Sequence, residues 1–132
     1  MTHLLDTNIC IALIRKRSDS LRERIENYRV GDLGISAITE SELRHGAEKS
    51  GDPKRNHAAI DRLKLTLPVL EFDATAAYEY GVIRRELERV GEIIGSMDLL
   101  IAAHAKSERL VLVTNNLREF RRVKRLTVES WV

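Results

Sequence analysis

The sequence has few of the residues that build disulfides, flexible linkers and membrane spans. Its 132 residues include one cysteine, two prolines and seven glycines. The lone Cys10, set in an apolar segment, has no partner for an internal disulfide and is typical of a small buried side chain in a reducing cytosol. Because prolines and glycines are scarce and no repeat divides the chain, we predict one domain over residues 1–132.

Two further absences narrow the class of protein. No apolar run approaches the roughly 20 residues that a membrane-spanning helix needs, and Asp6 interrupts the first apolar run, so a signal-peptide pattern is missing. We therefore expect a cytoplasmic protein without membrane contact. Charged residues make up 32% of the chain, but the net charge is only +2. This balance excludes a uniformly cationic surface, so any contact with nucleic acid must come from local patches.

Short apolar runs alternate with helical patterns along the chain. Hydrophobic residues make up 43% of the sequence, enough for one core. The short runs have the length of buried strands, and apolar residues spaced three and four apart predict helices between them. The predicted strands are residues 3–5, 33–37, 69–72, 111–113 and 126–128. This alternation predicts an α/β fold, a three-layer α/β/α sandwich with a mostly parallel five-stranded sheet.

Two aspartates lie at places where ligands and catalytic residues are commonly found in such a fold. Asp6 follows the first predicted strand, at the sheet edge where ligands bind in open α/β folds. Asp98 lies in the first turn of an almost wholly apolar predicted helix, whose dipole favours a carboxylate there. Helix capping also explains each aspartate, because a carboxylate at that place accepts bonds from free backbone N–H groups. The residues by themselves leave both interpretations open.

Other oxygen donors follow at similar places. Glu42 lies on the helix predicted over 39–50, turned away from its apolar side, where most glutamates are simply solvated. Thr114, Asn116 and Glu119 follow the strand that precedes the last one, although an Asn-Asn pair also favours a plain turn. Thr114 is placed to orient a neighbouring carboxylate. These residues can belong to a functional site only if the fold brings them to the same sheet edge as the aspartates.

Several carboxylates at one sheet edge would repel one another unless a cation lay between them. Hard oxygen ligands of this kind suit magnesium or manganese. Magnesium keeps several of its waters, which leaves a water free to attack and a position open for a phosphate oxygen. Zinc is not expected, because no histidine stands at ligand spacing from another histidine or from the cysteine. The histidines are His3, His45, His57 and His104.

Four segments carry a resemblance to a known family. They read LLDTNICI, ITESELRHGAEKS, IGSMDLLIAAHA and VTNNLREF, in this order. Together they resemble the PIN-domain ribonucleases, most closely the VapC toxins of type II toxin–antitoxin (VapBC) systems. The similarity runs from Met1 to Trp131, and the segments are specific only in combination. It implies a PIN-like fold and an endoribonuclease that hydrolyses phosphodiester bonds in transfer or ribosomal RNA, which would inhibit translation.

The resemblance also implies a metal site. Asp6, Glu42 and Asp98 match the family's catalytic carboxylates, which bind Mg²⁺ (or Mn²⁺). Where many PIN domains carry a further aspartate, this chain has Asn116. The resemblance therefore implies either a weaker neutral contact at Asn116 or a shift of that role to Glu119, and one ion or two.

Other side chains are implied to orient the carboxylates or bind the substrate. Thr7 and Ser36 resemble the small hydroxyl residues that orient the first carboxylate or contact substrate. Basic side chains are expected to hold the RNA backbone, since phosphate contacts dominate affinity for nucleic acid. The candidates are Arg15, Lys16, Arg84, Arg118 and Arg121.

The family implies a protein partner. A VapB-type antitoxin would wrap the toxin with its C-terminal segment and place a basic side chain in the acidic crevice, where an uncompensated carboxylate cluster favours it. A homodimer, a larger hetero-oligomer with the antitoxin, and contact with DNA only through the antitoxin are further expectations.

Three other classes compete with this interpretation. A haloacid-dehalogenase phosphatase needs a second aspartate two positions after the first, where this chain has Asn8. A receiver-like signalling module needs adjacent acids after the first strand, but Thr7 and Asn8 follow Asp6. The remaining alternative is a catalytically weakened PIN domain that only binds RNA or antitoxin, which Asn116 would explain.

Overall fold

The computed structural model describes residues 1–131, so the last residue of the predicted domain 1–132 lies outside the described part. Within those residues no helix is both long and apolar enough to cross a membrane. The elements are β1 (His3–Leu5), α1 (Thr7–Ile14), α2 (Asp19–Glu26), β2 (Leu33–Ser36), α3 (Ala37–Glu48), α4 (Pro53–Lys64), β3 (Val69–Leu70), α5 (Ala74–Arg89), α6 (Ser96–Ser107), β4 (Val111–Val113), α7 (Leu117–Phe120) and β5 (Val128–Glu129).

The five strands form one sheet in the order β3-β2-β1-β4-β5, and each pair is parallel. The predicted α/β fold with a five-stranded sheet is confirmed. The last strand begins later than the predicted 126–128, because the residues opposite Leu112 and Val113 of β4 are Val128 and Glu129. Leu126 instead packs as a partly buried side chain against the core.

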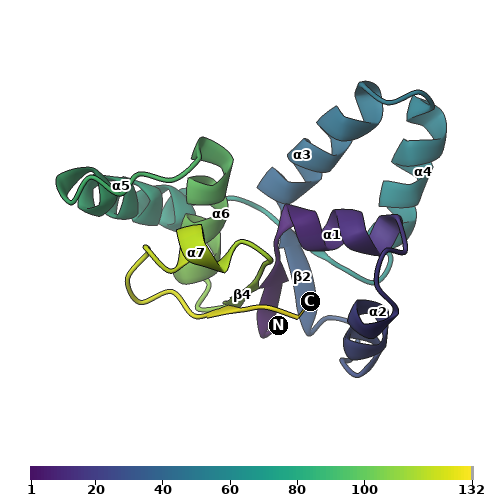
Figure 1. The fold of residues 1–132 in the computed structure, drawn as a ribbon, viewed down its shortest axis with the longest axis horizontal. Helices are drawn as coiled ribbons and strands as arrows, with labels where there is room; N and C mark the ends of the chain where they lie inside the picture. The colour runs from purple at the N-terminus through teal and green to yellow at the C-terminus, as the bar shows by residue number, and fades with distance from the viewer. Residues whose placement is uncertain (132) are drawn as a thin grey trace.

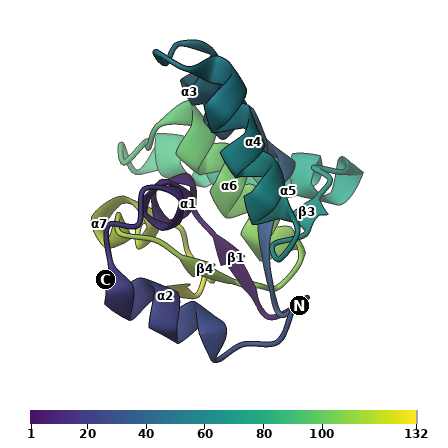
Figure 2. The ribbon, with the colours of Figure 1, turned by 90° about the vertical axis from the view of Figure 1, so that its right-hand side faces the viewer.

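Helices cover both faces of the sheet, as Figures 1 and 2 show. Because side chains alternate along a strand, neighbours point to opposite faces. Leu4 and Leu112 belong to the core under α5, α6 and α7, whereas Leu5 and Val113 belong to the core under α1 to α4. The predicted three-layer sandwich is therefore confirmed. Helix α6 is buried almost all round, as its apolar composition predicts.

The carboxyl ends of the three central strands meet at one edge of the sheet. β1 lies between β2 and β4, and each of these strands leads directly into the segment that carries a candidate site residue. Asp6 follows β1, α3 follows β2, and Thr114 follows β4. The parallel topology thus brings together residues that are about a hundred positions apart in sequence.

Candidate active site

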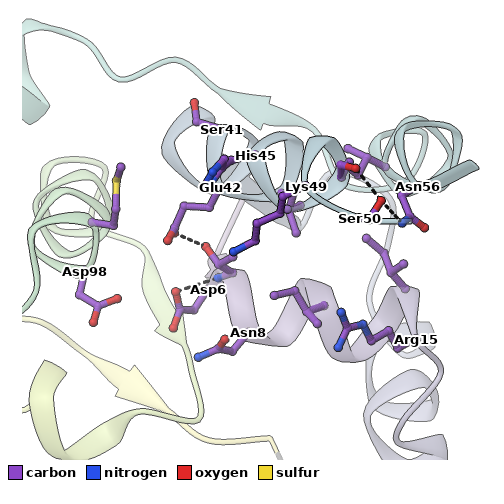
Figure 3. Close-up of a pocket in the computed structure, with 18 residues that line it drawn as sticks. Asp6, Asn8, Arg15, Ser41, Glu42, His45, Lys49, Ser50, Asn56 and Asp98 are labelled. Atoms are coloured by element: carbon purple, nitrogen blue, oxygen red, sulfur yellow. Dashed lines mark hydrogen bonds between the residues drawn. The ribbon is translucent and has the colours of Figure 1, made fainter. Parts of the chain in front are cut away.

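A cleft of about 710 Å³ runs along α1, α3 and α4 and ends at the first turn of α6. Three carboxylates, those of Asp6, Glu42 and Asp98, line it at one end, as Figure 3 shows. They come from three elements: the start of α1, the middle of α3 and the start of α6. In the close-up, Asp98 lies across the opening from Asp6 and Glu42.

Asp6 is held in place from two sides. Its side chain is 3% exposed. One carboxylate oxygen accepts the Thr7 N–H at 2.7 Å, and the other accepts the Thr114 hydroxyl at 2.7 Å. Burial raises the pKa of Asp6, the two hydrogen bonds lower it, and the charge of Glu42 raises it further. Asp6 therefore caps α1 and lines the cleft at once, so the two interpretations of its position are not alternatives.

Glu42 is tied to the same region through Thr7. The Thr7 hydroxyl donates to one oxygen of Glu42 at 2.6 Å, and Figure 3 shows this bond between α1 and α3. Thr7 thus contacts two of the three acids, by its backbone N–H and by its side chain. This arrangement fixes Glu42 relative to Asp6 without supplying any positive charge.

Asp98 carries the largest resolved electrostatic perturbation among the three. Its pKa is raised to about 6, first by burial, then by the negative charges of Asp6, Glu119 and Glu42, and also by a hydrogen bond with Glu119. A shift in this direction means that the neighbouring acids disfavour the ionised form. The carboxylates of this cleft end therefore interact with one another electrostatically.

The two candidates for the fourth acidic position differ in the structure. Glu119, on α7, lies near enough to Asp98 for its negative charge to raise the pKa of Asp98. For Asn116 the contact is made by the backbone, whose N–H donates to the Thr114 hydroxyl at 2.9 Å. Since Thr114 in turn donates to Asp6, the turn after β4 supports the first aspartate. Glu119 thus adds a charge to the acidic end, and Asn116 adds a backbone contact.

The donor set fits a magnesium-type ion bound partly through water. In residues 1–131 no three histidine, cysteine or acidic side chains lie close enough together to hold an ion directly. Magnesium, however, usually keeps several waters and takes only one or two carboxylates. The negative charges around Asp98 repel one another, and a bound divalent cation would reduce this repulsion. The close meeting of three acids expected from the sequence is replaced by a looser arrangement across a cleft.

Ser36 has contacts other than those expected from the resemblance. It is fully buried and does not line the cleft. Its hydroxyl accepts the Ile38 N–H at 3.0 Å, which caps α3, and lies 2.7 Å from Nδ1 of His104 on α6. A buried side chain with these partners is out of reach of a substrate in the cleft.

The basic candidates are spread over several surfaces. Arg15 lines the far part of the cleft. Lys16, Arg118 and Arg121 are exposed, the last two beside Glu119 at α7. Arg84 lies on α5, where it donates to Tyr80 at 2.8 Å and to Glu88 at 3.3 Å.

The sequence patterns did not single out two further cleft residues, His45 on α3 and Lys49 at the C-terminal cap of that helix. Together with Glu42 they follow three-four spacing, which puts them along one side of the helix. This spacing in the sequence could have indicated that the two residues share a helix face with Glu42. In Figure 3, His45 lies next to Glu42 and Lys49 extends toward Asp6. The cleft also has apolar lining residues, namely Ile11, Ile14, Leu43, Ala47 and Ile60.

Comparison with known proteins identifies the family. The PIN domain model matches residues 3–126. The chain belongs to the PIN domain family. The tRNA(fMet)-specific endonuclease VapC of Shigella flexneri is 48% identical over 128 residues, which cover 97% of this chain and 96% of the relative. This PIN domain is thus of the VapC type, and the phosphatase and receiver alternatives are excluded.

Solved structures of related PIN domains share the whole fold. VapBC from Salmonella typhimurium, bound to DNA, has a TM-score of 0.95 at 45% identity and covers 100% of this chain and 99% of the other. VapBC2 from Rickettsia felis, bound to a DNA fragment from its promoter, has a TM-score of 0.91 at 39% identity, with both chains covered completely. The whole of this chain thus has a counterpart in both structures.

Proposed function

We propose that this VapC-type ribonuclease uses Mg²⁺ or Mn²⁺, bound at the acidic end of the cleft by Asp6, Glu42 and Asp98, to hydrolyse RNA phosphodiester bonds. The observation that carries the proposal is that α1, α3 and α6 each bring one carboxylate, those of Asp6, Glu42 and Asp98, to the same end of the cleft. Within residues 1–131, the hydrogen-bond partners of Asp6 and Glu42 are threonines and a backbone N–H, and neither acid forms an ion pair. The site thus concentrates negative charge that a divalent cation would offset.

The protein's own contribution to the reaction is to hold the acids in place. When bound, the ion would supply an activated water and would neutralise charge on the phosphate. Asp6 presents a carboxylate whose two oxygens are fixed by Thr7 and Thr114. Glu42 is fixed by Thr7, as ligand or as the group that positions the attacking water. Asp98 must release its proton to act as a ligand, so burial beside other acids tunes when it can bind.

The substrate that the relatives favour is transfer RNA. A relative 48% identical is a tRNA(fMet)-specific endonuclease, and we propose the same class here, with ribosomal RNA as the second candidate. Arg118 is exposed on α7 and Arg121 is exposed at the C-terminal cap of that helix. The charge of Glu119, on the same helix, acts on Asp98, so these are the basic side chains best placed to hold the RNA backbone near the acids. Cleavage of either RNA would inhibit translation.

The partner that we propose is a VapB-type antitoxin in the same cleft. Two relatives of known structure are VapBC complexes bound to DNA. An apolar wall beside an acidic end suits a peptide with apolar anchors and a cationic side chain. Through the antitoxin the complex would bind DNA. A homodimer, a larger assembly with the antitoxin and a cytoplasmic location complete the proposal.

The deciding experiment is RNA cleavage by Asp6→Asn and Asp98→Asn. The purified full chain, freed of antitoxin, is incubated with transfer RNA and Mg²⁺ or Mn²⁺, and the cleaved ends are mapped. Each variant should lose about 1,000-fold or more of the rate, because several kcal/mol of metal-dependent stabilisation are removed. Glu40→Gln is the matched control, because Glu40 lies on α3 but does not line the cleft. This variant should cleave RNA at the wild-type rate.

Full activity in either aspartate variant would contradict the mechanism. Absence of cleavage in the wild-type chain with either metal, together with tight antitoxin binding, would favour the alternative of a weakened PIN domain that only binds.

A further inference from the structure

A buried histidine links the two helices that carry Glu42 and Asp98. Nδ1 of His104 lies 2.7 Å from the Ser36 hydroxyl, and both residues are 0% exposed. His104 lies on α6, whose first turn holds Asp98. Ser36 ends β2 and caps α3, the helix that holds Glu42. This contact joins α3 to α6 on the protein side of the cleft.

The surroundings hold the imidazole ring in one position. The ring packs edge-on against Phe72, with centroids 5.5 Å apart and an interplanar angle of 77°. Burial lowers the pKa of His104 more than Glu108, Asp73 and the Glu71 backbone raise it, which favours the neutral ring. A neutral imidazole can both donate and accept, which matches a hydroxyl that already accepts a backbone N–H.

Stability alone does not account for a histidine at this place. Helix α6 otherwise buries apolar side chains, among them Leu99, Ile101 and Ala102. An apolar residue of similar size would avoid the cost of desolvating an imidazole and a hydroxyl. What the polar pair adds is a directional bond, which fixes the start of α3 relative to α6.

We propose that His104 is a positioning residue that, through Ser36, sets the separation of Glu42 and Asp98 across the cleft and thereby the affinity of the site for a divalent ion. The proposal rests on the proposed function, since it concerns how the same acids are held. Residues that hold metal ligands in place, without touching the metal, commonly change metal affinity when they are replaced.

The test is Mn²⁺ binding to the full chain without RNA, measured by the loss of the electron paramagnetic resonance signal of free Mn²⁺. His104→Leu fills the space but removes the bond, and it should raise the dissociation constant about tenfold or more. His104→Asn keeps a polar group where Nδ1 lies, and it should stay within about threefold of wild type because the bond is retained. Ile101→Val, on the same helix, weakens packing only and should bind Mn²⁺ as wild type does.

Ser36→Ala breaks the same bond from the other side and serves if His104→Leu fails to fold. Because Ser36→Ala also removes the cap at the Ile38 N–H, it should weaken Mn²⁺ binding at least as much as His104→Leu does. The double variant should be no worse than Ser36→Ala alone, since the bond with His104 is already absent there.

Wild-type Mn²⁺ affinity in both His104→Leu and Ser36→Ala would overturn the proposal. So would equal losses in His104→Asn and His104→Leu, because the effect would then come from the ring and not from the bond. Asp98→Asn distinguishes a failure of the positioning role of His104 from a failure of the proposed metal site. If Asp98→Asn weakens Mn²⁺ binding and His104→Leu does not, only the positioning role fails; if Asp98→Asn has no effect, the metal site itself is wrong.

Discussion

Helix α3 carries two glutamates whose surroundings are opposite in charge. Glu40 accepts Nη2 of Arg44 at 3.0 Å and the ammonium of Lys64 at 3.0 Å. Glu42, two residues later, accepts only the Thr7 hydroxyl among the described residues and faces the acidic end of the cleft. The same helix and the same residue type thus serve two different regions.

The two regions differ in how charge is compensated. Burial alone would raise the pKa of Glu40, but its bonds with Lys64 and Arg44 outweigh it and hold that pKa below its usual range. Arg44 also donates to Asp61 at 2.6 Å, so this cluster ties α3 to α4. At the cleft, by contrast, the pKa of Asp98 is raised to about 6. Charge is thus paired in the cluster that joins α3 to α4, whereas the carboxylates at the cleft repel one another.

The sharpest test of this difference compares Glu42→Gln with Glu40→Gln. Glu42→Gln should reduce RNA cleavage about 100-fold and raise the metal concentration for half-maximal rate, while RNA binding changes less. Glu40→Gln should leave cleavage unchanged and lower the free energy of unfolding by about 1 kcal/mol. Titration of the cleavage rate against Mg²⁺, with urea unfolding of both variants, separates the two effects. If both variants behaved alike, the contrast between the regions would be wrong.

The paired cluster itself is tested by Arg44→Ala. The change leaves Glu40 and Asp61 without their guanidinium partner, and the free energy of unfolding should fall by about 1–2 kcal/mol. Below the unfolding transition, Mn²⁺ affinity should equal that of wild type. A large loss of Mn²⁺ affinity in the folded variant would show that this cluster also serves the cleft.

The unpaired region predicts an unusual dependence of stability on pH in metal-free protein. Because the pKa of Asp98 is raised from 3.8 to about 6, the folded state binds this proton more tightly than the unfolded state. Stability from Asp98 is therefore fully present below pH 3.8 and is lost as the pH rises to about 6. Relative to Asp98→Asn, the wild type should lose stability across this window in chelator. A parallel pH dependence of the two proteins would contradict the proposed repulsion.

The smallest effect is expected from Asn116→Asp. A further negative charge beside Thr114 should tighten Mn²⁺ binding a few-fold, because affinity for hard cations follows ligand charge. The free Mn²⁺ signal measures it, with Asn115→Asp in the same turn as control. Equal affinity in Asn116→Asp and wild type would assign Asn116 to the turn alone.

The sequence predicted much of the fold because its signals are local. Asp73 caps α5 by accepting the Ala76 N–H, and Asp52 begins α4 with Pro53 in the first turn, as the residue types indicate. The last strand was predicted too early, because its start depends on which residues meet β4 and not on its own composition.

What the sequence by itself determined is therefore the order of strands and helices, the buried character of α6 and, through four segments, the resemblance to the family. Only the tertiary structure decided that the charge of Glu119 acts on Asp98, that Asn116 contributes its backbone, and that Ser36 bonds with His104. The physical reason is how far apart in sequence the interacting residues are. Periodicity and capping depend on residues within a few positions of one another, whereas these contacts depend on how elements distant in sequence pack across the sheet.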